Sequence, residues 1–224
     1  MNNRRRAIMG IAKLGGRLPN EYQEVEYIES TGTQYIDTNV NFTNLTSVES
    51  KFIFTSLNLG TVANNIVSCL ATIGSNNIRG YLISTRGQNN NYCWRLGYGS
   101  SLINSTISAL SDTLYTVKVE VSSGQQKMVV NNVEVLSSNS QETFVSNVSL
   151  ALFANKSRTT VDGYTNAKIY YVKIIENAIL IRNFIPCYRK QDNKPGLYDL
   201  VNDVFYTNAN LSATQDFIVG PDVN

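Results

Sequence analysis

Three acidic residues near the start of the chain have a spacing that could support glycoside hydrolysis. Glu24, Glu26 and Glu29 lie within one short stretch, and on an extended strand the first two would share a face about 7 Å apart. Retaining hydrolysis needs two carboxyl groups about 5–5.5 Å apart, so this pair could in principle bridge a sugar. Acidic side chains also protect the edge strand of a sheet from aggregation. We expect this structural role for the three acids, and no catalysis.

Residue types that other common reactions require are missing. The sequence contains no histidine, which excludes Ser-His-Asp and Cys-His arrangements. Cys69, Cys93 and Cys187 are odd in number and widely spaced, which fits neither a disulfide framework nor a zinc site. We expect these cysteines to be small buried hydrophobes, and we expect the chain to be a non-enzyme without a cofactor.

Calcium is the metal that needs separate consideration. Asp112 and the pair Asp162-Gly163 lie in predicted loops, where carboxylates could bind a calcium ion. Such an ion takes about six to eight oxygen ligands, and the sequence shows no cluster of acids that could supply them. We therefore expect no metal site.

One stretch combines aromatic and polar residues in a way that suits sugars, which stack on rings and hydrogen-bond to amide and guanidinium groups. It begins with Asn89 and Asn90 and continues through Tyr92, Trp94, Arg95 and Tyr98. Alternatively, Tyr92, Trp94 and Leu96 share a parity and could form the core face of a strand. We expect that arrangement, with Arg95 and Tyr98 the more exposed residues. Arg95, Tyr98, Asn89 and Asn90 are therefore the candidate glycan-binding residues.

Basic residues are concentrated at the N-terminus. Arg4, Arg5, Arg6, Lys13 and Arg17 precede the first acid, Glu21, so the first 17 residues carry +5 and the remaining 14 basic and 17 acidic residues give −3. A basic arm can bind an acidic partner, although a solvated or packing peptide would have the same composition. We divide the chain into an arm, residues 1–20, that docks on a partner, and a body, residues 21–224. The slightly acidic body is not expected to bind nucleic acid.

The elements that must position these residues are predicted to be strands throughout. Residues Val117, Val119 and Val121 alternate with polar residues, and the turn-forming pair Asn131-Asn132 follows a second short strand, which predicts a meander. In the strand from Ile169 to Ile175 the alternation slips by one residue, which indicates a bulge. Hydrophobic residues make up 42% and charged ones 16%, a balance that favours a β-protein over a disordered chain.

The sequence shows no sign of membrane insertion or secretion. No apolar run approaches the length of about 18 residues that a membrane span needs. The apolar stretch from Ala7 to Ala12 is too short for a secretory signal. We therefore expect synthesis in a cytoplasm.

Two stretches resemble a known family. The first runs from Leu18 to Thr38 and includes Glu29-Ser30-Thr31-Gly32-Thr33-Gln34-Tyr35-Ile36-Asp37. The second runs from Ala167 to Asn208 and includes Phe184-Ile185-Pro186-Cys187-Tyr188 and Gly196-Leu197-Tyr198-Asp199-Leu200. Together they resemble the concanavalin A-like, laminin-G-like jelly-roll domains of bacteriophage and prophage virion proteins such as tail fibres. The resemblance covers about residues 18–223, and it departs at Ala209–Thr214, where related domains have a Gly-Thr-Gly-like turn.

The resemblance implies an all-β antiparallel sandwich and a non-enzymatic virion structural or appendage protein, made in the bacterial host cytoplasm. Its partners would be other virion subunits, contacted through the arm, a host-surface polysaccharide, and further copies of the chain in a homo-oligomer. A free carbohydrate-binding lectin is the alternative. A divergent glycoside hydrolase is the third hypothesis, because retaining enzymes with this fold have an E-x-D-x-x-E strand motif that Glu24, Glu26 and Glu29 imitate.

Overall fold

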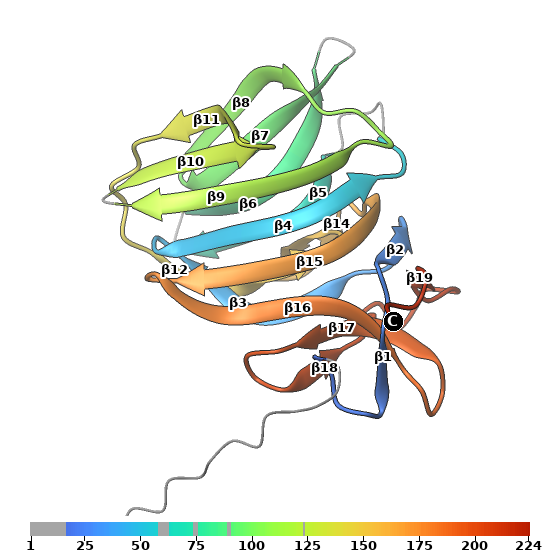
Figure 1. The fold of residues 1–224 in the computed structure, drawn as a ribbon. Coiled ribbons are helices and arrows are strands. Elements are labelled where there is room, and N and C mark those ends of the chain that lie inside the picture. Colours follow the sequence, from blue (N-terminus) through green and yellow to red (C-terminus); the bar gives the residue numbers. More distant parts are fainter. Residues whose placement is uncertain (1–16, 58–62, 74–75, 89–90, 123) are drawn as a thin grey trace, which may run out of the picture.

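Two β-sheets face each other across a common core in the computed structural model, which describes residues 17–57, 63–73, 76–88, 91–122 and 124–224 (Figure 1). The first sheet has the strand order β11 (Val133–Ser138), β10 (Gln125–Val130), β9 (Leu114–Ser122), β4 (Thr46–Phe54), β15 (Asn166–Glu176), β16 (Ile179–Arg189), β17 (Lys194–Asp199) and β18 (Val204–Tyr206). Three short strands extend it: β1 (Tyr22–Glu24) pairs with β16, β2 (Ile28–Thr31) with β15, and β19 (Ile218–Val219) with β2.

The second sheet has the order β14 (Val161–Asp162), β13 (Asn155–Ser157), β5 (Asn64–Ile73), β6 (Asn76–Gln88), β7 (Asn91–Gly99) and β8 (Ser101–Ser108). Strand β12 (Val145–Leu152) pairs with β5 and with β3 (Ile36–Thr43). Pairing is antiparallel except between β13 and β5. The part of the chain that the structure describes contains no helix long and apolar enough to span a membrane.

Alternation of apolar and polar residues places one face of each strand in the core. In β4 the side chains of Val48, Phe52 and Phe54 are buried, whereas Glu49, Lys51 and Ile53 on the opposite face are only partly buried, as the sequence predicts. Across the core, Trp94 of β7 packs against Tyr115 of β9 with ring centroids 5.0 Å apart. Each such buried aromatic side chain contributes about 1.5–3 kcal/mol of hydrophobic stabilisation.

The predicted meander and bulge are both confirmed. Strands β9, β10 and β11 pair in sequence order, and the turn between the last two places Asn131 at φ 48° and Asn132 at φ 68°, the left-handed backbone that a tight hairpin turn requires. In β15, the register with β4 shifts between Ile169 and Tyr171.

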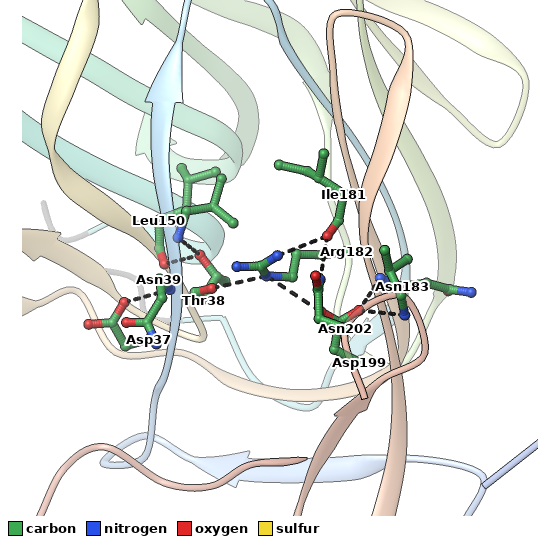
Figure 2. Close-up of polar contacts among 11 residues, drawn as sticks. Asp37, Thr38, Asn39, Leu150, Ile181, Arg182, Asn183, Asp199 and Asn202 are labelled. Atoms are coloured by element: carbon green, nitrogen blue, oxygen red, sulfur yellow. Dashed lines mark hydrogen bonds and ion pairs between the residues drawn. The ribbon is translucent and has the colours of Figure 1, made fainter. Parts of the chain in front are cut away.

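A buried polar network joins the two sheets at one edge (Figure 2). Asp199, which is fully buried, accepts hydrogen bonds from the backbone N–H of Asn183 at 2.9 Å and the side-chain amide of Asn202 at 2.7 Å. Arg182 lies 3.5 Å from the same carboxylate. Its Nε also donates to the carbonyl of Thr38 on β3, 3.4 Å away. The Arg182 side chain of the first sheet therefore contacts the second sheet while its charge is compensated.

The two ends of the described chain are paired with each other. Val25 forms an isolated antiparallel bridge with Asp222, and the N–H of Val223 donates to the carbonyl of Glu24 at 2.9 Å. We call this pairing of residues 24–25 with residues 222–223 the clasp. Leu18 packs in a small apolar cluster with Ile185, Cys187 and Tyr198, separate from the main core.

Candidate functional site

The outer face of the second sheet is hollowed where β5, β6 and β7 pass beside β13 and β14. The hollow has a volume of about 310 Å³ and is lined by Ala63, Asn65, Leu70, Tyr81, Arg95, Asn155, Asp162 and Gly163. We call it the Arg95 hollow. The pairing register shifts on both sides of it, between Asn65 and Val67 of β5 and between Tyr81 and Ser84 of β6. Bulges of this kind re-aim side chains and are frequent beside binding sites.

Arg95 lies in the Arg95 hollow because its neighbours Trp94 and Leu96 have the opposite parity and face the core. The residue is only 8% exposed, and its guanidinium stacks over the ring of Tyr81 with its Cζ atom 4.3 Å from the ring centroid. Burial lowers the pKa of Arg95, the charges of Arg86 and Arg79 lower it further, and Tyr81 acts in the opposite direction. The buried Nε of Arg95 has no hydrogen-bond partner among the described residues.

The ring of Tyr81 can lie against β7 because the residue opposite it on that strand is a glycine. A Cβ atom on Gly97 would come within 2.6 Å of the ring carbon Cδ2 of Tyr81. Burial raises the pKa of Tyr81 and the charge of Asp162 adds to this, although Arg95 and Arg79 oppose it. The phenol is therefore neutral at ordinary pH and can both donate and accept a hydrogen bond.

Amide and carboxylate groups complete the Arg95 hollow. The side-chain nitrogen of Asn65 donates to the carbonyls of Ala63 at 3.2 Å and Gly163 at 2.9 Å, which fixes the orientation of the amide. Its buried Oδ1 then has no partner among the described residues. Asp162 accepts a hydrogen bond from the side chain of Asn155 at 2.9 Å, so one of its two oxygens is held by the protein.

An ion pair anchors the strand that carries Asn155. Lys156, the next residue on β13, forms an ion pair with Asp37 of β3 and donates to the hydroxyl of Ser149 at 2.8 Å. Burial by itself raises the pKa of Asp37, but the hydrogen bonds from Lys156, Ser149 and the backbone of Asn39 outweigh it and hold the pKa below its ordinary value. The short strands β13 and β14 are therefore fixed against the body of the sheet.

The expected exposure of the candidate glycan-binding residues is wrong. Tyr98 is 1% exposed and packs edge-on against Phe42 in the core, because it has the same parity as Trp94 and Leu96. Arg95 is also buried, although it lies on the outer face of the sheet. The expectation that Trp94 belongs to the core is confirmed. Asn89 and Asn90 lie outside the described residues.

Tyr81, Asn65 and Asn155 are not among the site residues predicted from the sequence, which suggests Asp162 only as a calcium ligand. The signal that could have located Tyr81 is Gly97, because a glycine within a strand often marks a close approach of a neighbouring group. No comparable local signal points to the two asparagines.

The three acids of the N-terminal stretch do not share one strand. Glu24 ends β1, which pairs with β16, whereas Glu29 belongs to β2, which pairs with β15; Glu26 lies at the bend between them. Glu24 is paired with Arg17 and Glu29 with Lys168. Glu24 and Glu26 therefore do not lie on one extended strand, as a retaining pair with the predicted spacing would require.

Described residues provide no group of three or more His, Cys, Asp or Glu side chains that could hold a metal ion. The cysteines are buried and free, as the sequence predicts. Burial raises the pKa of Cys69 and of Cys187 to about 12 in each case. These two thiols are thus protonated and unreactive at neutral pH.

Of the five basic residues expected to dock on a partner, the structure describes Arg17. Its guanidinium donates to both carboxylate oxygens of Glu24, so its charge is used within the chain. Arg4, Arg5, Arg6 and Lys13 lie outside the described residues.

Comparisons with known proteins support the fold. No protein-family model matches the chain, and no curated protein matches it. A heptameric SAP-like pentraxin from Limulus polyphemus is similar with a TM-score of 0.53 and 9% identity, covering 89% of this chain and 94% of that one. The CBM40 of the Ruminococcus gnavus IT-sialidase, bound to α2,3-sialyllactose, has a TM-score of 0.46 and 14% identity over 71% of this chain and 92% of that one.

A glycosyl hydrolase family protein from Mycobacterium fortuitum has a TM-score of 0.34 and 12% identity over 66% of this chain and 72% of its own. The pentraxin likeness, at 9% identity, bears on the fold alone. Together with the strand order, it shows that the chain is an all-β jelly-roll sandwich of the concanavalin-like type.

Proposed function

We propose that the chain is a non-catalytic carbohydrate-binding module that binds its ligand in the Arg95 hollow. The observation that carries the proposal is a pair of buried polar atoms without a partner among the described residues, the donor Nε of Arg95 and the acceptor Oδ1 of Asn65, whose residues line one hollow. Buried polar atoms are nearly always hydrogen-bonded, and an unpaired one costs about 1–3 kcal/mol. Both atoms are closed to solvent, so a sugar hydroxyl group would satisfy them once the lining side chains move to admit it.

The rest of the hollow suits a sugar as well. Tyr81 offers an aromatic ring, and Asp162 and Asn155 offer a carboxylate and an amide on the opposite side. Sugars combine apolar C–H faces with a rim of hydroxyls, so a ring surrounded by amide, carboxylate and guanidinium groups complements them. The volume of about 310 Å³ is at the lower end of the range for small-molecule sites, and is suited to a terminal sugar residue.

Binding to a glycan array, compared between wild type and two tyrosine variants, tests this proposal. Tyr81→Ala should weaken binding about tenfold or more, because it removes the ring against which both Arg95 and the ligand pack. The matched control is Tyr170→Ala, which removes a tyrosine of β15 that packs against Tyr27, the residue before β2. Equal binding by wild type and Tyr81→Ala, or a loss confined to the Tyr170 variant, would place the ligand elsewhere.

The virion setting is a narrower proposal that rests on the sequence resemblance and on the basic arm. In this setting the chain would be a phage appendage or structural protein, located in the virion as a homo-oligomer, and the Arg95 hollow would face a host polysaccharide. Deleting residues 1–17 retains Leu18 and its apolar cluster. The truncated protein should therefore keep its unfolding temperature but lose incorporation into particles, whereas a free lectin would lose nothing.

A further inference from the structure

Arg95 differs from the partly buried Arg182 in forming no ion pair with a described carboxylate. Arg182, whose side chain is 17% exposed, pairs with the carboxylate of Asp199, and the more exposed Arg17 and Arg189 pair with Glu24 and Asp192. For Arg95 no ion pair joins the guanidinium to any described carboxylate, although the residue is more than nine-tenths buried. A buried charge without a partner is costly, so its retention needs an explanation.

The charge around the Arg95 hollow is positive. Arg79 and Arg86 lie close enough on β6 to disfavour a further cation at Arg95. Arg79 donates to the backbone carbonyl of Ser100 at 2.9 Å, and no described carboxylate pairs with either residue. Asp162 is the one acid that lines the hollow, and it accepts a hydrogen bond from Asn155. Arg95 and Asp162 are the charged residues among the described lining, and Arg79 and Arg86 lie beside the hollow on β6, so these four residues together carry a net positive charge.

The way in which Arg95 is held also leaves the terminal nitrogens of its guanidinium without hydrogen-bond partners among the described residues. The guanidinium lies over the face of the Tyr81 ring, and stacking of this kind uses the flat face of the group. The N–H bonds point outward in the plane, in the fork geometry that matches two oxygens of a carboxylate or sulfate. An aromatic support also fixes the fork, so that less side-chain entropy is lost when an oxyanion binds.

From the unpaired stacked Arg95 and its two neighbouring cations, we infer that the sugar bound in the Arg95 hollow is acidic, with its carboxylate or sulfate group seated against the guanidinium of Arg95. This inference rests on the proposed carbohydrate-binding function and specifies its ligand class. The oxyanion would accept hydrogen bonds from the terminal nitrogens of Arg95. Asn65, Asn155 and Asp162 would contact the hydroxyl groups of the same sugar.

A glycan array printed with matched sets tests the inference: the same sugar backbones in neutral, carboxylated, methyl-esterified and sulfated form. Wild type should bind one acidic form at least tenfold more tightly than its neutral counterpart, and the carboxylated and sulfated arms identify the anion. Arg95→Gln should remove this preference, with a loss of about 10- to 100-fold for the acidic form, as expected for charge-assisted hydrogen bonds. Arg95→Lys, which keeps the charge but not the fork, should recover only part of it.

The control variant is Lys190→Gln, which removes one positive charge from an exposed residue at the end of β16. It should leave the preference unchanged, which excludes a general effect of net charge. Equal binding of acidic and neutral forms, with a loss on Tyr81→Ala, would overturn the inference and leave the proposed function standing. An equal loss of both forms on Arg95→Gln would also overturn it. If folded wild-type protein binds no form on the array, the inference and the proposed function both fail.

Discussion

Arg95 and Arg182 allow a sharp test, because the same substitution should change stability in opposite directions. Arg95→Met removes a buried donor that has no partner, worth about 1–3 kcal/mol, and loses a cation–π contact with Tyr81 worth about 0.5–2 kcal/mol. Methionine keeps the packing of the apolar stem. The net change is a gain of about 1 kcal/mol in the free energy of unfolding, which raises the melting temperature by about 2–4 °C in a protein of this size.

Arg182→Met should have the opposite effect, because it leaves the fully buried Asp199 without its cation. Breaking a buried ion pair costs about 3–5 kcal/mol. Since Asn183, Val201 and Asn202 continue to donate to the carboxylate, we expect about 3 kcal/mol and a fall of about 6–12 °C in the melting temperature.

Urea unfolding followed by fluorescence measures both changes. The chain has a single tryptophan, Trp94, which is fully buried in the core and reports its exposure directly. The free energies of unfolding of the two variants should differ by about 4 kcal/mol, with a similar dependence on urea concentration. If Arg95→Met unfolds as easily as Arg182→Met, then Arg95 has a stabilising partner in the free protein, and the argument for a ligand at this position is refuted.

Three further outcomes follow from the geometry. Gly97→Ala places a Cβ 2.6 Å from the Tyr81 ring, so it should displace the ring and weaken glycan binding several-fold; unchanged affinity would mean that the ring position does not matter. The pKa of the Asp37 carboxyl is lowered in the folded protein. Its ion pair with Lys156 therefore stabilises the fold at pH values above the unfolded-state pKa of about 3.9, and this stabilisation is lost as the pH falls through the lower folded-state pKa. Asp37→Asn should therefore reduce the fall in melting temperature measured from about pH 5 to pH 2, and an identical pH profile would contradict this assignment. Addition of a chelator should change neither glycan binding nor melting temperature, whereas a loss that calcium restores would reveal a metal site.

The core could be predicted from the sequence because it depends on local alternation. Val48, Phe52 and Phe54 repeat with the period of a strand, and the Asn131-Asn132 turn has its own backbone signature. The Arg95 hollow could not be predicted in this way. Its residues come from separate strands, and the two register shifts beside Asn65 and Tyr81 decide which side chains meet. Such shifts depend on packing across the whole sheet as well as on the local sequence.

The misplacement of Tyr98 has a related cause. An aromatic residue with a hydroxyl suits both a surface and a core, so residue type alone does not decide between them. In the structure its hydroxyl donates to the backbone carbonyl of Thr43 at 3.2 Å, which satisfies the polar atom inside the fold. Burial then costs little, and the ring contributes to the core.

The clasp between the two ends of the described chain has a mechanical consequence. Residues 24–25 and 222–223 pair antiparallel, and Arg17 and Asn224 line the same surface hollow, so a tension applied through both ends pulls from one side of the pair. The hydrogen bonds of the clasp would then be loaded one after another, as in a zip, and not all at once. The clasp should therefore yield at low force and absorb a pull on the chain before the sandwich that holds the Arg95 hollow is strained.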